Sequence, residues 1–195
     1  MVQLLTGLRE TLKLEGVGPI IRRFFINTLF DSTFALLGIV VGSAFAGVGL
    51  NVVIVTMLST ALALGISTGV SVYEAESMEQ ERKISDLEKA LFTDLKDTSI
   101  EKTAKSTIWL ATLINFATPL FSFSITITPF IFVALGLLQI GVAAWISVAL
   151  ALGTLFGAGV YLGRVGKTNP YLKGVRMVLF GVLAFVIGFL LNTLL

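Results

Sequence analysis

Residues 106–163 read STIWLATLINFATPLFSFSITITPFIFVALGLLQIGVAAWISVALALGTLFGAGVYLG, and none of these 58 side chains is charged. Crossing the hydrocarbon core of a bilayer takes about 20 predominantly apolar residues in a helix. The run is too long for one such helix and suits two, with the turn between them predicted at 137–141. This stretch therefore predicts a membrane protein.

Three more apolar segments complete the pattern, and the composition agrees with it, because 55% of the 195 residues are hydrophobic and only 13% are charged. Soluble domains carry about 25% charged residues. The chain is predicted to contain five transmembrane helices, at 24–50, 51–73, 106–136, 139–163 and 177–195. Residues 1–20 have leucines at helical spacing and predict an amphipathic helix that lies in the membrane interface. The predicted fold class is all-α, a single integral membrane domain over 1–195.

The charged segment 74–105 separates the second and third predicted helices. No Gly or Pro occurs between Gly69 and Leu95, so the second span is predicted to continue into this cytoplasmic helical segment without a break. An apolar stripe at helical spacing is predicted to pack against a neighbour; it consists of Ile84, Leu87, Leu91 and Leu95. The sequence leaves open whether the segment is one helix or two.

The 14 lysines and arginines indicate the orientation. All of them lie before the first span, between the second and third, or between the fourth and fifth. With five spans these three regions face the same side, which the positive-inside rule makes cytoplasmic. We therefore expect a cytoplasmic N-terminus and an outside C-terminus in the plasma membrane of a prokaryote. The net charge of +2 gives no reason to expect a nucleic-acid partner.

The absence of cysteine and histidine excludes whole classes of site. Disulfides, zinc fingers, iron–sulfur clusters, cysteine nucleophiles and Ser-His-Asp triads all need one or the other. A single intramembrane carboxylate also leaves no acid–base pair for catalysis. The chain is therefore not expected to be an enzyme, and no catalytic residue is predicted.

Asp31 is the only ionisable side chain inside a predicted span. A carboxylate in a membrane helix costs about 3 kcal/mol and usually faces a polar interior or a transport path. Such a group can exchange protons for a bound cation. The alternative is that the first span begins later and that Asp31, with Ser32 and Thr33 after it, caps the helix at the interface.

A second candidate site follows the second span. Glu74, Met78 and Glu81 share one helical face, and Glu76 and Glu79 form another pair. Carboxylate oxygens with one thioether suit a transient divalent-metal site. The alternative is an ordinary solvated helix end, balanced by nearby arginine and lysine.

Small residues and one proline mark candidate structural positions. Three G-x-x-x-G pairs predict helix packing or dimer faces, at Gly38 and Gly42, Gly65 and Gly69, and Gly153 and Gly157. Pro119 lies within the third span, where it is predicted to kink the helix and free a backbone carbonyl. This makes Pro119 a candidate hinge.

Four stretches, in order, carry a family resemblance. Residues 31–42 read DSTFALLGIVVG, with an acidic residue eleven positions before a glycine; 63–91 is a small-residue helix running into a Glu- and Arg-rich one; 119–123 has Pro-Leu-x-x-Phe; and 163–181 contains KGVRM. Together they resemble the vacuolar iron transporter family, over most of the chain from residue 24. The chain looks like a compact prokaryotic-type member that lacks the family's long cytoplasmic metal-binding domain.

The resemblance implies a homodimer of five-helix protomers that moves Fe²⁺, and often Mn²⁺, out of the cytosol in exchange for protons. It places Asp31 on the translocation path. It also favours the capture-site interpretation of Glu74, Glu76, Met78, Glu79 and Glu81. One departure is clear, because a Met and a Glu of the family's second helix are replaced by Ile66 and Val70.

The expected function is therefore proton-coupled export of Fe²⁺ or Mn²⁺. The expected partners are the divalent ion, the lipid bilayer and a second copy of the chain. No resident cofactor is expected, since the metal is cargo. Beside Asp31, candidate membrane ligands are the hydroxyls of Ser32, Thr33, Ser67 and Thr68. Two alternatives remain: a non-transporting membrane scaffold or sensor, and a transporter of another substrate.

Overall fold

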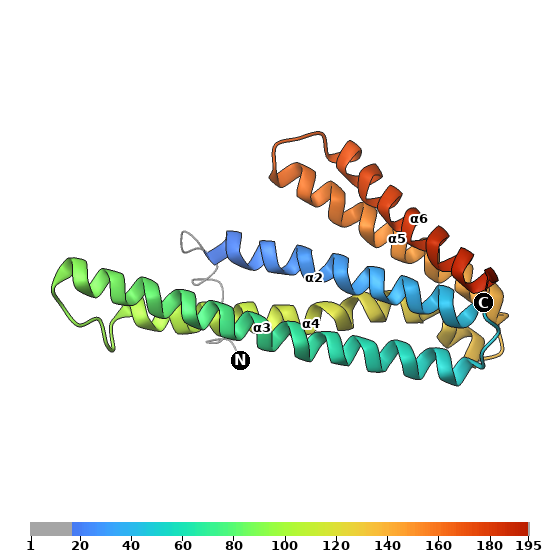
Figure 1. Ribbon diagram of the computed structural model, residues 1–195, viewed down its shortest axis with the longest axis horizontal. Coiled ribbons are helices and arrows are strands. Elements are labelled where there is room, and N and C mark those ends of the chain that lie inside the picture. Colours follow the sequence, from blue (N-terminus) through green and yellow to red (C-terminus); the bar gives the residue numbers. More distant parts are fainter. Residues whose placement is uncertain (1–16, 195) are drawn as a thin grey trace. The chain divides into compact units, whose positions relative to one another are not determined.

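The computed structural model describes residues 17–194, and these residues contain helices and no strand. The elements are labelled in Figure 1. In chain order they are α2 (Val17–Ile39), the π-helical turn η1 (Val40–Ala44), α3 (Leu50–Leu91), α4 (Ser99–Ala134), α5 (Ile140–Val165) and α6 (Pro170–Leu194).

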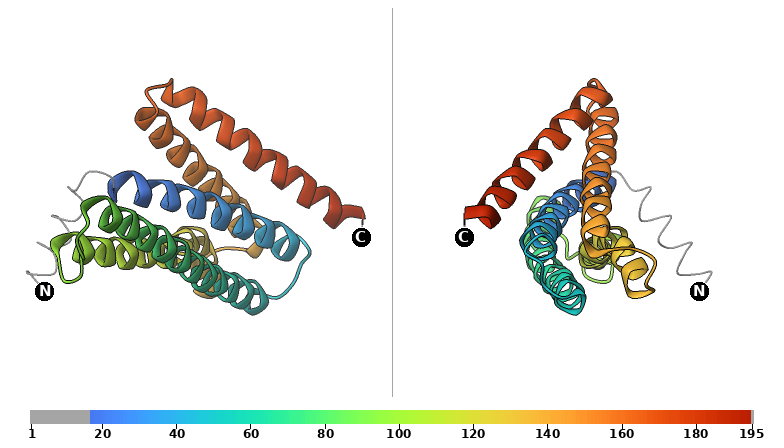
Figure 2. Two further views of the ribbon diagram at one scale, coloured as in Figure 1. Left: turned by 60° about the vertical axis from the view of Figure 1, so that its left-hand side comes forward. Right: turned by 90° about the vertical axis from the view of Figure 1, so that its right-hand side faces the viewer.

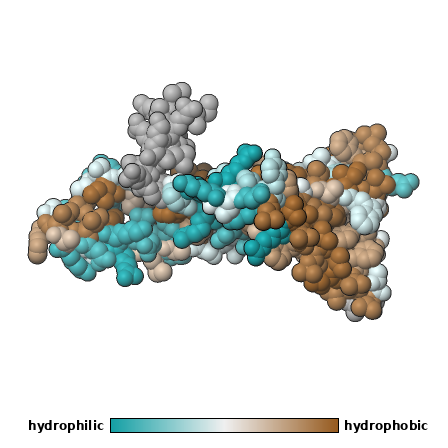
Figure 3. Space-filling model, turned by 90° about the horizontal axis from the view of Figure 1, so that it is seen from above, coloured by the Kyte–Doolittle hydropathy of each residue, from teal (hydrophilic) through white to brown (hydrophobic). Residues whose placement is uncertain are grey.

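The prediction of five spanning helices is confirmed. Five helices are long and apolar enough to cross a membrane, the first formed by α2 and η1 together and the others by α3 to α6. Figure 3 shows hydrophilic and hydrophobic residues separated over one face of the molecule. The chain is an integral membrane protein with an all-α fold.

The helix ends differ from the sequence-based boundaries. The first helix stops at Ala44, before the turn at 45–47, whereas 24–50 was expected. The last helix begins at Pro170 instead of 177. Proline is tolerated at the first position of a helix, and hydrophobicity alone does not detect a polar helical start. Most of the predicted interfacial helix at 1–20 lies outside the described residues; its last residues form the start of α2.

Helix α3 runs for 42 residues without interruption, so the second span does continue into the charged segment. That segment contains two helices, because a turn at 92–98 separates α3 from α4. Of the predicted apolar stripe, Leu95 is buried, whereas Leu87 and Leu91 remain exposed. The stripe is therefore only partly packed within the chain.

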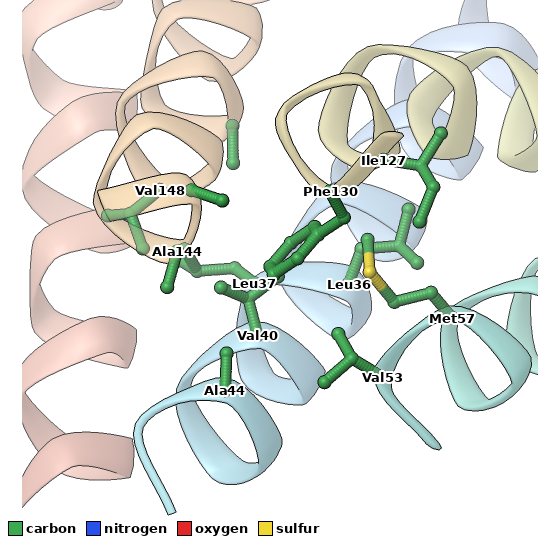
Figure 4. Packing of buried hydrophobic residues seen from close by; sticks show 12 residues of the cluster. Leu36, Leu37, Val40, Ala44, Val53, Met57, Ile127, Phe130, Ala144 and Val148 are labelled. Atoms are coloured by element: carbon green, nitrogen blue, oxygen red, sulfur yellow. The ribbon is translucent and has the colours of Figure 1, made fainter. Parts of the chain in front are cut away.

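The structure divides into two compact units. Among the described residues, one comprises 17–25 and 66–117, and the other 26–65 and 118–194. The first unit has a small core; its buried members are Ile21, Val72, Leu110 and Ala111. The second unit has the larger core, in which the Phe130 side chain is fully buried among Leu37, Val40 and Met57 (Figure 4).

Helices α5 and α6 of the second unit form an antiparallel hairpin (Figure 2) whose contact is made by glycines. A Cβ atom on Gly159 would lie 2.8 Å from the Cα atom of Gly174, and one on Gly163 would lie 2.5 Å from the Cα atom of Pro170. Small residues let transmembrane helices approach this closely. The hairpin therefore depends on backbone-to-backbone contact.

The predicted G-x-x-x-G pairs differ from Gly159 and Gly163 in how closely other helices approach them. Gly65 and Gly69 are both buried, and a Cβ on Gly69 would lie 3.4 Å from the Cβ of Phe116. No neighbouring atom lies within 4 Å of a Cβ built on any of the other four, Gly38, Gly42, Gly153 and Gly157. A packing role for these four stays a prediction that concerns a second chain.

Two prolines lie inside α4, Pro119 and Pro129, and the helix continues through both. Proline has no N–H, so Pro119 leaves the carbonyl of Asn115 without its helical donor. The Thr68 hydroxyl donates to this carbonyl at 3.2 Å. Near Pro129, the Ser147 hydroxyl donates to the Thr126 carbonyl at 2.7 Å. The Thr68 hydroxyl thus supports the carbonyl that Pro119 leaves without its helical donor, and the Ser147 bond joins α5 to α4 close to Pro129; whether Pro119 acts as a hinge stays a prediction.

We predict that Gly159→Ala destabilises the protein by about 1–3 kcal/mol, because the new methyl group would overlap the backbone of α6. Gly157→Ala on the same helix is the control, since the space around it is open. It should be neutral or stabilising by up to about 1 kcal/mol, through helix propensity. Thermal unfolding in detergent measures both, and equal effects would contradict the proposed contact.

Candidate functional site

Asp31 lies inside a helix that is long and apolar enough to cross a membrane. The first span runs from Gly18 to Ala44, so 13 residues precede Asp31 and 13 follow it. Helix α2 begins at Val17, far before Asp31. The alternative in which Asp31 caps the start of the helix is therefore wrong, because Asp31 lies well inside the helix.

The Asp31 side chain is exposed. Asn27, Gly38 and Gly42 are also exposed. Their separations of four, seven and four residues along the chain place all four positions on one side of the helix, which we name the Asp31 face. The space over Gly38 and Gly42 is open.

Ser32 and Thr33 point the other way and are buried. Their hydroxyls donate to backbone carbonyls one turn earlier, from Ser32 to Thr28 at 2.7 Å and from Thr33 to Leu29 at 2.6 Å. Ser122 of α4 lies 3.0 Å from the Ser32 hydroxyl oxygen and 3.3 Å from that of Thr33. Because the protons of Ser32 and Thr33 are committed to carbonyls, Ser122 is the donor between the helices.

These buried hydroxyls form a connected set, which we name the hydroxyl cluster: Ser32, Thr33, Ser122, Thr126 and Ser147. The cluster joins α2, α4 and α5 within the second unit. Its members satisfy one another and the backbone, as hydrogen bonds between membrane helices commonly do. The structure therefore does not bring the predicted ligands Ser32 and Thr33 to the same side of α2 as Asp31.

The other two predicted hydroxyl ligands belong to the first unit. Ser67 is exposed on α3. The Thr68 hydroxyl donates to the Asn115 carbonyl, as described above. Their assignment as metal ligands stays a prediction.

The predicted capture residues lie on one continuous stretch of α3 but differ in exposure. Glu76 is 3% exposed and accepts a hydrogen bond from the Gln80 amide at 3.4 Å. Glu79 pairs with Lys83 at 3.2 Å. Glu74, Met78 and Glu81 are exposed. Over residues 17–194, no three acidic side chains come close enough to hold a metal ion. A capture site stays a prediction that needs more than one chain or a rearrangement.

The turn between α3 and α4 uses acidic residues that the sequence analysis did not single out. The carboxylate of Glu88 accepts the Leu95 N–H at 2.9 Å, and that of Asp94 accepts the Lys96 N–H at 2.9 Å. Glu101 accepts the Asp97 N–H at 2.7 Å. The spacing Thr98-x-x-Glu101 is a helix-start signal that predicts part of this arrangement. These carboxylates shape the turn.

Sequence reasoning also missed Ser122 and Ser147. A detectable signal was present, because Thr118, Ser122 and Thr126 recur every four residues in an uncharged span and so share one face of α4. Hydroxyl groups repeated on one face of a membrane helix mark a side that contacts other helices.

No family model matches the chain. It is similar to Uncharacterized protein MJ0645 of Methanocaldococcus jannaschii, with 25% identity over 173 residues. The alignment covers 87% of each chain. The similarity therefore extends over nearly the whole membrane domain and carries no function with it.

We predict that Ser122→Ala lowers the free energy of unfolding by about 0.6–1.7 kcal/mol, the usual range for a hydrogen bond between membrane helices. Ser124→Ala is the control on the same helix, because that exposed hydroxyl donates only to its own helix, at the Leu120 carbonyl. Unfolding in detergent gives both values. Indistinguishable effects of the two substitutions would contradict the bond between α2 and α4.

The pKa of Asp94 is lowered from its usual 3.8, chiefly by the Lys96 N–H and less by the Lys96 ammonium group. A lowered pKa stabilises the turn above pH 3.8, and this contribution disappears as the pH falls through the pKa of the folded state. We predict that Lys96→Gln leaves the pKa of Asp94 below 3.8, because the N–H remains. Carboxyl NMR titration measures it, and a return to 3.8 would assign the effect to the ammonium group instead.

Proposed function

We propose that the protein is a homodimeric transporter that exports Fe²⁺ or Mn²⁺ from the cytoplasm in exchange for protons. The observation that supports this most strongly is Asp31, a carboxylate inside a helix that can span a membrane, on an open helix face. An acidic residue there costs about 3 kcal/mol unless it is used, so its presence favours an ion path.

The chemistry of the Asp31 face fits a hard divalent cation. A carboxylate and the amide oxygen of Asn27 are oxygen ligands, which Mn²⁺ accepts readily. Metal binding requires the ionised carboxylate and releases its proton. A single carboxylate that binds a proton and a metal ion in alternation is the simplest basis for antiport.

A second copy of the chain would complete this face. One protomer offers a single carboxylate here, whereas two copies meeting at the Asp31 face would offer two carboxylates and two amides. Gly38 and Gly42 lie on the same side with open space over them, and small residues permit close approach of two membrane helices. The hydroxyl cluster on the opposite side of α2 would hold the helix in position.

The orientation follows from charge. With a cytoplasmic N-terminus, the glutamates after the second span lie on the cytoplasmic side, where metal would be collected before it enters the membrane. Two copies would present Glu74, Glu76, Met78, Glu79 and Glu81 twice. The plasma membrane of a prokaryote is the proposed location.

A transporter of another substrate is the second candidate, and a specific feature favours it. Ile66 and Val70 occupy the positions of the family's helix-two ligands and line an apolar groove of about 290 Å³ with Phe116. Over residues 17–194, the one buried side-chain polar atom without a hydrogen-bond partner is the Thr112 hydroxyl oxygen, and Thr112 also lines the groove. An apolar molecule with one polar group would fit this lining better than a metal ion. The alternative of a non-transporting scaffold or sensor requires neither the apolar groove nor the Thr112 hydroxyl.

We predict pH-gradient-driven uptake of Fe²⁺ or Mn²⁺ into proteoliposomes, and a loss of at least about 10-fold in Asp31→Asn, since even residues that only orient metal ligands have effects of this size. Asp86→Asn is the control, because it removes the same charge from the exposed part of α3. A well-folded wild type that moves neither metal would exclude the antiporter. Uptake that persists in Asp31→Asn would exclude Asp31 from the path.

A further inference from the structure

Four cationic side chains gather at the end of the α5–α6 hairpin: Arg164, Lys167, Lys173 and Arg176. We name this group the basic turn. The sequence from 140 to 194 contains no acidic residue. Each ion pair among the described residues lies between Glu79 and Lys105, so none includes a member of the basic turn. The turn is a concentrated positive surface without an internal counter-charge.

The backbone of the basic turn is well defined. Helix α5 ends with the Thr168 N–H bonded to the Gly163 carbonyl at 3.0 Å, and the Lys167 N–H to the Arg164 carbonyl at 3.4 Å. This is the Schellman arrangement, which places one residue in the left-handed conformation, usually glycine. Here that residue is Lys167, with φ at 51°. The chain thus carries a cation at a position where glycine would be more stable.

The start of α6 fixes the other side of the turn. Asn169 caps the helix, accepting the N–H groups of Tyr171 at 3.1 Å and Leu172 at 3.3 Å. Absence of a side chain at Gly163 lets Pro170 sit directly against α5. The helix ends that carry the cations are therefore joined by a loop held by backbone hydrogen bonds and by the Asn169 cap.

An ammonium group and a hydroxyl both lie near Gly166 of this loop. The point where a Cβ atom of Gly166 would lie is 3.6 Å from the Lys173 Nζ and 3.9 Å from the Thr168 hydroxyl oxygen. Arg164 stands in the last turn of α5, and Arg176 is held against the Phe180 ring, with its Cζ 5.8 Å from the ring centre. Cations and a hydroxyl presented together are suited to a phosphate oxygen.

Exposed aromatic and apolar side chains lie close to the basic turn along α5 and α6. Tyr161 and Tyr171 are 46% and 67% exposed, and Leu172 is 70% exposed. Tyrosine is enriched where membrane helices meet the headgroup layer. The positive surface therefore lies where lipid headgroups are found.

We propose that the basic turn binds the headgroup phosphate of an anionic phospholipid, with Lys173 and Arg164 as direct partners and Lys167 and Arg176 at the rim. The interaction is separate from the proposed transport function. It tethers the α5–α6 hairpin to the leaflet that carries anionic lipid, and each cation near such a surface strengthens binding about five-fold.

The test is native mass spectrometry of the full chain in neutral detergent, titrated with phosphatidylglycerol or phosphatidylcholine. Wild type should bind phosphatidylglycerol more tightly. Arg164→Gln with Lys173→Gln should weaken that binding by about 25-fold and leave phosphatidylcholine unaffected. Lys167→Gly should weaken it about five-fold while raising the unfolding temperature, which separates lipid binding from fold stability.

The matched control is Lys89→Gln with Lys96→Gln, which removes the same charge from the α3–α4 end. It should bind both lipids as the wild type does. Equal binding of the two lipids by the wild type, an unchanged affinity in the Arg164 and Lys173 variant, or a matching loss in the control would each overturn the proposal. Displacement of phosphatidylglycerol by excess inorganic phosphate would assign the site to a soluble anion and would also overturn it.

Discussion

The hydrocarbon core of a membrane contains no water, so each backbone N–H and C=O inside it needs a partner from the protein. Helices meet this demand everywhere except where the hydrogen-bond pattern is interrupted. In α4 the interruptions are Pro119 and Pro129, and hydroxyls of Thr68 and Ser147 reach carbonyls beside them. These hydroxyl groups bond to backbone carbonyls. Their role therefore differs from the ion-binding role proposed for Asp31.

The same environment changes what holds the helices together. Lipid tails are as apolar as leucine side chains, so burial of apolar surface between membrane helices gives little net stabilisation. Close packing and hydrogen bonds must therefore hold the helices together. In the second unit, glycine contact joins α5 to α6, the hydroxyl cluster joins α2 to α4 and α5, and Phe130 fills the space among Leu37, Val40 and Met57.

The five spans and the continuous α3 were predictable from the sequence, because hydrophobic length and the absence of Gly and Pro are local properties. The position of Asp31 within its helix was predictable only as one of two alternatives. The side of the helix on which Asp31 lies was not predictable, because the rotation of a helix about its axis depends on partners far along the chain. Ser32 and Thr33 face inward, where they contact Ser122 of α4, and no sequence feature near residue 32 predicts this contact.

The glycine pairs show the same limit. G-x-x-x-G spacing identifies positions where a close contact is possible, but it does not say which helix makes it or whether one is made within the chain. A Cβ atom on Gly159 or Gly163 would meet α6, whereas one on Gly153 or Gly157, on the same helix, would have no neighbouring atom within 4 Å. The acidic residues of the α3–α4 turn were overlooked because side-chain bonds to a turn leave only weak sequence signals.

The link between Ser32 and Ser122 joins residues 90 positions apart. At about 5–20 residues per second, a ribosome takes about 5–18 s to add the intervening chain. During synthesis the first helix, with its carboxylate, is therefore present for several seconds before the part of α4 that carries Ser122 has been made. Its final orientation is decided late, so the insertion machinery has to tolerate a provisional state of α2 for many seconds.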